Sequence, residues 1–198
     1  MVPPLLKGYA GLVVYADDFV MCFQNKKEAE MVYELLKRRM GKFGMRLEEN
    51  KTRLIEFGRF AEENCKCRGT RSETFTFLGF THYCSKSRSG KFRVKRKTSR
   101  KKLAKKCKEI GETIKKMRRS RLEVIIGKLN QILVGYYHYY GITDNIKSLT
   151  DFKYEVTKRL FYWLNRRSQR KSYTWEEFNN MLTVYPLAAP KIYVNVYA

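Results

Sequence analysis

The sequence predicts an α+β protein in which antiparallel strands and one helix are followed by a basic bundle of helices. Apolar residues alternate in short segments up to residue 97, and they recur every three or four residues after Ser99. Hydrophobic residues make up 43% of the 198 residues, which is enough for a buried core. The length suits one large domain or two small ones.

The chain begins with a predicted hairpin and a helix. Apolar residues at 12–15 and 19–23 predict two strands, and Ala16-Asp17-Asp18 between them predicts a tight turn. Residues 26–43 carry apolar side chains at helical spacing, and Gly44 follows them where a helix commonly ends.

The rest of the first half reads as short strands and loops. We expect strands at 45–47 and 53–57, a polar loop at 59–73, a strand pair within 74–83 and, after a turn at 87–90, a strand at 91–97.

The second half predicts a three-helix unit from Ser99 to Asn165, followed by a short fourth helix. An apolar stripe at Leu103, Cys107, Ile110, Ile114 and Met117 marks the first helix. Possible capping boxes, in which a Ser or Thr side chain pairs with an acid three residues later, precede the others: Ser120/Glu123, Ser148/Asp151 and Thr174/Glu177. Residues 192–197 alternate like a strand.

The charge is strongly positive and unevenly distributed. The formal net charge is +23. Residues 1–84 hold 14 basic and 11 acidic residues, whereas residues 85–198 hold 28 and 8. This balance favours a polyanion as partner, with nucleic acid preferred over a membrane surface and over a merely solvated helix face. The chain lacks an apolar run of the roughly 18 residues that span a bilayer, and five cysteines without a secretory signal suggest reduced thiols in a cytoplasm.

The most specific motif is Tyr15-Ala16-Asp17-Asp18, which places two adjacent carboxylates at a hairpin tip. Crowded carboxylates repel each other unless a cation lies between them. Mg²⁺ prefers oxygen ligands and also binds substrate phosphates, so the pair suggests metal-assisted phosphoryl transfer. A solvated Asp-Asp turn is the alternative.

A second constellation leaves two interpretations open. Cys65, Cys67, His82 and Cys84 are possible zinc ligands, but the spacing between the first two is tighter than usual, so reduced thiols with a strand histidine are the favoured interpretation.

Five segments resemble group II intron reverse transcriptases. Residues 14–20 resemble the YADD box of that family, and Asn50-Lys51-Thr52-Arg53 lies where the family has an element after the palm helix. Phe77-Leu78-Gly79-Phe80 is similar to the primer-grip box. The tyrosine cluster at 135–140 and the basic pattern at 166–175 are similar to the maturase-specific thumb, domain X. The resemblance covers about residues 8–185.

The resemblance implies a domain plan and a set of site residues. Residues 1–97 would form the C-terminal half of a polymerase palm with primer-grip strands, 98–183 the basic α-helical thumb, and 184–198 a tail or strand. Asp17 and Asp18 would be catalytic ligands of a two-metal Mg²⁺ site, and Lys51 either stabilises the leaving pyrophosphate or is a surface lysine in a turn. Primer and nucleotide contacts would come from Tyr15, Ala16, Leu78, Gly79 and Phe80.

The thumb reads as an RNA-binding module from its residues alone, because a helix with a basic stripe opposite an apolar face suits the phosphates of RNA. The residues expected to bind RNA are Lys95, Arg96, Lys97, Arg100, Lys101, Lys102, Lys105, Lys106, Arg118, Arg119 and Arg121. Tyrosines 136, 137, 139 and 140 either stack on unpaired bases or pack, with packing favoured for Tyr136 and Tyr140. By resemblance, the partners are group II intron RNA and primer DNA.

The family also carries an earlier palm carboxylate and a fingers module, and both are expected to precede residue 1. We therefore expect an RNA-directed DNA polymerase piece that does not polymerise alone, either a truncated remnant or one part of a split enzyme completed by a separate chain. The alternative is a non-catalytic RNA-binding maturase module that assists intron splicing. A cytoplasmic, RNA-associated location fits both.

Overall fold

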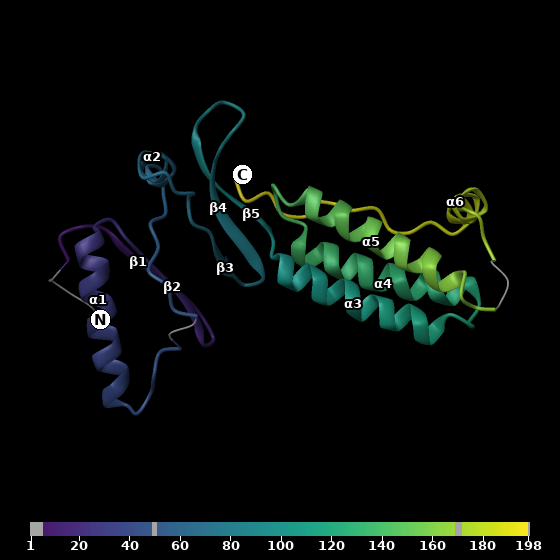
Figure 1. Ribbon diagram of the computed structural model, residues 1–198, viewed down its shortest axis with the longest axis horizontal. Helices are drawn as coiled ribbons and strands as arrows, with labels where there is room; N and C mark the ends of the chain where they lie inside the picture. Colours follow the sequence, from purple (N-terminus) through teal and green to yellow (C-terminus); the bar gives the residue numbers. More distant parts are fainter. Residues whose placement is uncertain (1–5, 49–50, 169–171, 198) are drawn as a thin grey trace. The chain divides into compact units, whose positions relative to one another are not determined.

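The computed structural model describes residues 6–48, 51–168 and 172–197 (Figure 1). The chain divides into two compact units, Met1–Phe77 and Leu78–Ala198. The described residues form two small antiparallel sheets and six helices, which confirms the predicted α+β class. Asn50 and Lys171, which belong to the motifs quoted above, lie outside the described residues.

The first unit contains the predicted hairpin and helix. Strands β1 (Ala10–Tyr15) and β2 (Asp18–Phe23) pair antiparallel, and Tyr15 lies opposite Asp18 beside the two-residue turn. Helix α1 (Lys26–Lys42) packs against β2 and buries Ala29 and Val32. The backbone then turns through a left-handed Gly44, as the sequence predicts.

Two predictions for the first unit are wrong. Residues 45–48 and 51–57 are not strands, because alternation alone does not supply the neighbouring strand that a ladder of hydrogen bonds requires. Within the predicted loop at 59–73, Ala61–Cys67 forms helix α2. Its two buried residues, Ala61 and Cys65, are four apart, and Lys66 pairs with Glu62 across one turn, so the helical spacing is present but short.

The second sheet has the strand order β3-β4-β5. Its strands are β3 (Phe75–Phe77), β4 (Phe80–Lys86) and β5 (Phe92–Thr98), so the predicted strand pair and the turn at 87–90 are confirmed. Leu78 and Gly79 both have positive φ angles, of 49° and 79°, which is typical of a tight two-residue hairpin turn.

Three long helices carry the core of the second unit (Figure 1). They are α3 (Arg100–Met117), α4 (Leu122–Tyr140) and α5 (Ile146–Leu164), and the short α6 (Trp175–Val184) follows. Helix α5 packs against both α3 and α4. The largest side chains that are fully buried come from all four helices: Tyr137, Phe152, Phe178, Ile110, Ile114, Ile125, Leu129, Leu133, Leu149, Leu160, Leu164 and Val156. The predicted three-helix unit is thus confirmed.

The helix starts agree with the sequence in part. Thr174 and Glu177 form the complete capping box at α6. The boxes at Ser120 and Ser148 are wrong, because the residues that precede α4 and α5 are Arg121 and Asn145. The carboxylate of Glu123 instead accepts a hydrogen bond from the Tyr185 hydroxyl, 2.7 Å away. Residues 192–197 contribute one parallel bridge, between Ile142 and Val194, in place of the predicted strand.

A buried asparagine joins three elements of the second unit. The side-chain oxygen of Asn145 accepts from the Thr98 backbone N–H at 2.8 Å. Its amide nitrogen donates to the Thr98 hydroxyl at 2.9 Å and to the Tyr140 carbonyl at 2.8 Å. Asn145 therefore connects the end of β5, the end of α4 and the start of α5.

We expect Asn145→Ala to lower the free energy of unfolding of the second unit by about 2–4 kcal/mol, because it removes the partner of both the Thr98 N–H and the Tyr140 carbonyl, and each buried polar group left without its partner costs ~1–3 kcal/mol. Urea denaturation followed by near-UV circular dichroism measures the change. Asn179→Ala, at an exposed position of α6, serves as the control and should change stability by less than about 0.5 kcal/mol. Equal midpoints for the two variants would contradict this role of Asn145.

Candidate nucleic-acid interface and catalytic hairpin

The carboxylates of Asp17 and Asp18 are exposed at the tip of the β1–β2 hairpin. Ala16, the first turn residue, has a left-handed backbone with φ 53°. Tyr15 ends β1 with 63% of its surface exposed. The hairpin thus presents two adjacent sets of carboxylate oxygens to solvent.

This donor set fits Mg²⁺, which is bound through carboxylate oxygens, water and substrate phosphates. Two carboxylates fill only part of its octahedral shell, so the remaining positions fall to water, phosphate or further acidic groups. Within the described ranges, no group of three or more His, Cys, Asp and Glu side chains is arranged to hold a metal ion. Cys65 and Cys67 lie on α2, whereas His82 and Cys84 lie on β4.

Lys51 is exposed in a turn. Its backbone N–H donates to the Glu48 carbonyl at 3.0 Å, and the N–H of Thr52 donates to the same oxygen at 2.9 Å.

The turn at Leu78-Gly79-Phe80 packs against the end of α4. The Tyr139 hydroxyl donates to the Leu78 carbonyl at 3.0 Å. The Phe80 ring lies 6.0 Å from the Tyr139 ring in a stacked arrangement and 5.2 Å from the Tyr140 ring edge-to-face. The turn therefore belongs to the helical unit, and its shape is set by the tyrosines of α4.

The tyrosine cluster of α4 divides into packing and exposed members. Tyr137 is fully buried, its hydroxyl donates to the Ala188 carbonyl at 3.3 Å, and burial raises its pKa to about 12. Tyr136 stacks on Phe152 with ring centroids 3.8 Å apart, and burial raises its pKa as well. The predicted packing of Tyr136 is confirmed, and Tyr137 packs too. Tyr139, with 56% of its surface exposed, remains accessible to a base.

The alternation of β5 separates the three basic residues predicted there. Lys95 and Lys97 share one face, where the Lys97 ammonium lies 5.2 Å from the centroid of the Tyr83 ring. Arg96 lies on the other face, directly opposite His82 on β4. Burial and the charge of Arg96 together lower the His82 pKa. Lys95 and Lys97 are thus displayed on one surface and Arg96 on its reverse.

The solvent-facing side of α3 is strongly basic. Arg100, Lys101, Lys102 and Lys105 are exposed, while the opposite side of the helix is buried. Lys106 forms an ion pair with Glu109 at 3.3 Å. This surface presents several cations at a spacing of one helical turn, which suits a row of phosphates.

The connection from α3 to α4 carries three further predicted residues. The Arg118 guanidinium lies 5.8 Å from the centroid of the Trp163 ring, so it is partly engaged by the core. Arg119 and Arg121 are exposed.

Sequence reasoning missed two features of the second unit. The Arg93 guanidinium lies 3.8 Å from the Tyr197 ring, and the Tyr197 hydroxyl donates to Asp144 at 2.7 Å, so the C-terminal segment is attached to β5. The exposed side of α5 carries tyrosines and cations four residues apart, a spacing that is visible in the sequence once the buried side is known.

Comparison with protein families gives two matches. Residues 4–82 match reverse transcriptase (RNA-dependent DNA polymerase), and residues 100–180 match the group II intron maturase-specific domain. Comparison with curated proteins gives no significant match. None of the helices in the described ranges is long and apolar enough to cross a membrane.

The hairpin with its two aspartates lies in the reverse transcriptase region, and the basic helical unit that follows contains the maturase-specific region. The chain belongs to the group II intron reverse transcriptase/maturase family, and it combines a reverse transcriptase region with a maturase-specific region in that order. The domain boundary expected at residues 97–98 stays a prediction.

Gly79→Ala should destabilise the second unit more than Gly90→Ala. Both glycines have left-handed backbones, with φ of 79° and 76°, so each alanine costs about 1–2 kcal/mol. A Cβ at Gly79 would also lie 2.8 Å from the Tyr140 hydroxyl oxygen, whereas a Cβ at Gly90 meets open space. Thermal and urea unfolding of both variants measures the difference.

Removal of that oxygen isolates the steric part of the effect. In the Gly79→Ala background, Tyr140→Phe should bring the loss of stability close to that of Gly90→Ala. If Gly79→Ala and Gly90→Ala lower stability equally while Tyr140 is unchanged, contact with Tyr140 does not constrain the turn.

Proposed function

We propose that this chain acts in reverse transcription and splicing of group II intron RNA, as an RNA-directed DNA polymerase with a maturase domain. The observation that carries the proposal is the exposed Asp17-Asp18 pair at the tip of a hairpin in a member of this family. The basic surface of the second unit supports it, because a polymerase of this class must hold RNA.

In the proposed mechanism, Asp17 and Asp18 contribute carboxylate oxygens to a Mg²⁺ site. Bound Mg²⁺ supplies stabilisation of the charge that develops on phosphoryl oxygens. The turn that begins at Ala16 places Asp17 and Asp18 at the exposed tip of the hairpin, and the exposed Tyr15 ring provides a surface beside them for the primer end or the incoming nucleotide. Lys51 offers a cation for the leaving pyrophosphate.

The primer is proposed to contact the turn at Leu78-Gly79-Phe80. Gly79 has no side chain and the Tyr140 hydroxyl fills the space that a Cβ would take, so the proposed primer contact is with the backbone of the turn. The hydrogen bond from Tyr139 and the packing of Phe80 hold the turn in one shape, so contact with a primer requires little reordering.

Intron RNA is the proposed partner of the second unit. The exposed cations of α3, with Lys95 and Lys97 of β5 and Arg119 and Arg121 after α3, would contact phosphates and position the RNA without reading its sequence. Binding through such contacts releases counterions, so affinity should fall steeply as salt increases.

Asp17→Asn should abolish primer extension and leave RNA affinity unchanged. The assay uses an RNA template, a DNA primer and Mg²⁺, with the chain alone and with a polypeptide that carries the fingers and first palm strands of a group II intron reverse transcriptase. The chain alone is not expected to extend the primer, and in the complemented sample the substitution should lower extension by at least about 10²-fold, the scale for removal of a group that stabilises transition-state charge. RNA affinity should stay within about twofold, because the change lies outside the proposed phosphate contacts.

Glu30→Gln is the matched control, since it removes one exposed carboxylate from α1 of the same unit. Its extension activity should equal that of the unaltered chain. Extension that survives Asp17→Asn would refute the catalytic role. Salt-sensitive RNA binding without extension in any sample would instead support a non-catalytic maturase module.

A further inference from the structure

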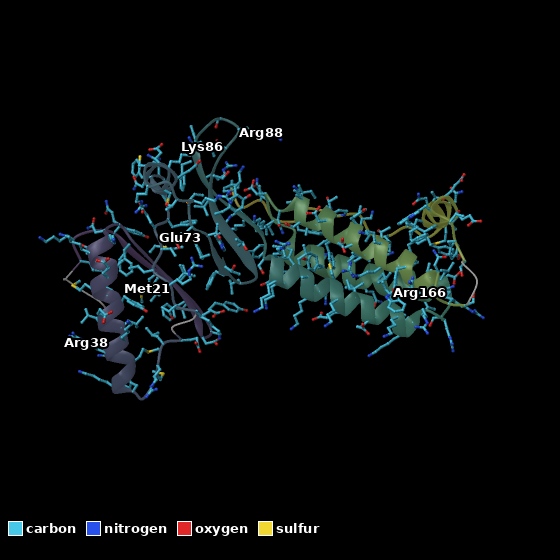
Figure 2. All side chains as sticks on the ribbon, viewed as in Figure 1. Met21, Arg38, Glu73, Lys86, Arg88 and Arg166 are labelled. Atoms are coloured by element: carbon cyan, nitrogen blue, oxygen red, sulfur yellow. The ribbon has the colours of Figure 1, made fainter. Side chains whose placement is uncertain are left out.

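The exposed side of α5 carries an alternating row of aromatic and basic side chains. Tyr154, Lys158, Tyr162 and Arg166 follow each other at intervals of four residues, so they lie along one side of the helix and its end. Figure 2 labels Arg166, just after the last turn of α5. We call these four residues the α5 stripe.

The core does not account for the two rings of the α5 stripe. Helix α5 buries Leu149, Phe152, Val156, Leu160 and Leu164 on its other side. Tyr154 and Tyr162 are instead 61% and 46% exposed. Large exposed rings on an otherwise amphipathic helix are the kind of apolar surface that marks a binding site.

Each ring of the α5 stripe is paired with a cation. The Lys158 ammonium lies 5.3 Å from the centroid of the Tyr154 ring, and the Arg166 guanidinium lies 3.5 Å from that of the Tyr162 ring. The second distance is that of a guanidinium stacked on one face of a ring, and a guanidinium held in this way still carries the charge and the planar surface that attract a planar or anionic ligand.

The charges around the α5 stripe also favour an anion. Two acidic residues of α5 lie close by, Asp151 and Glu155, and Glu155 is ion-paired with Arg159. The unit itself is rich in Lys and Arg, with 28 basic and 8 acidic residues after position 84. A protein partner with an apolar surface would gain nothing from this excess of charge, whereas a nucleic acid would.

We propose that the α5 stripe binds unpaired RNA, with bases stacked on Tyr154 and Tyr162 and phosphates beside Lys158 and Arg166. The two tyrosines lie two turns apart, roughly 12 Å along the helix axis, so a single strand laid along α5 meets both. Stacking of bases on aromatic rings tolerates any sequence and requires that the bases are not paired. The proposal rests on the proposed function, that the chain binds RNA, and adds a surface selective for single strands to the phosphate-binding side of α3.

Fluorescence anisotropy with two RNA probes of equal charge tests the proposal on the full chain. One probe is an unstructured oligouridine, and the other is a blunt duplex with the same number of phosphates. The double variant Tyr154→Leu/Tyr162→Leu removes both rings and keeps apolar side chains. It should weaken binding of the single strand about tenfold or more and change duplex binding by less than about twofold.

Two control variants make the result specific. Tyr154→Phe/Tyr162→Phe keeps the rings and should bind the single strand like the unaltered chain. Lys101→Ala/Lys105→Ala removes charges from α3 and should weaken both probes alike. An unaltered chain that binds neither probe would refute the proposed function itself, which distinguishes that failure from failure of the α5 stripe.

The proposal is overturned if the leucine variant binds the single strand normally, if it loses both probes equally, or if the phenylalanine variant loses as much as the leucine variant. Photocrosslinking of the unaltered chain to a 4-thiouridine oligonucleotide gives a second readout that needs no substitution. Crosslinks at Tyr154 or Tyr162 are expected, and crosslinks confined to other helices would overturn the proposal.

Discussion

The side-chain amide of Asn145 joins the ends of one strand and two helices of the second unit at one buried point. It binds the N–H and hydroxyl of Thr98 at the end of β5 and the carbonyl of Tyr140 at the end of α4, and it precedes α5 directly. Because Thr98 is followed by Ser99, whose side chain caps α3, the same point also sets where α3 begins. The hydrogen bonds of one amide therefore link β5 to all three long helices.

The proposed contacts with nucleic acid depend on that arrangement. Tyr139 and Tyr140 lie in the last turn of α4 and contact the turn at Leu78 and Gly79. The Gly79 carbonyl also accepts a hydrogen bond from the Ser99 N–H at 2.9 Å. The basic side of α3 and the α5 stripe face away from the shared apolar core, since each helix buries one side only. Packing of the core fixes the positions of the helices and leaves the cations at the surface. There water screens the repulsion between the cations, and the phosphates of an RNA can neutralise their charge.

The spacing of residues in the sequence predicted those helices and caps whose contacts lie close along the chain. It failed where contacts with residues far away in the sequence set the local structure. The apolar stripe of α3 and the capping box at Thr174 follow from local spacing, and both are present in the structure. The box at Ser120 failed because the Glu123 carboxylate pairs with Tyr185, 62 residues away. Asn145 could not be recognised as a buried centre, because its partners are separated from it by up to 47 residues. Sequence alone also gave no means of seeing that Arg96 lies on the reverse of the surface that carries its neighbours.

Lysine acetylation of the chain, free and bound to a group II intron RNA, tests the central claim most directly. Mass spectrometry reads every lysine in one experiment, so Lys26 and Lys27 at the start of α1 serve as internal references. The account predicts that RNA protects Lys101, Lys102 and Lys105 on α3 several-fold, with protection lost at high salt. If the lysines of α3 react with the bound chain as fast as with the free chain, the second unit does not bind RNA through this surface.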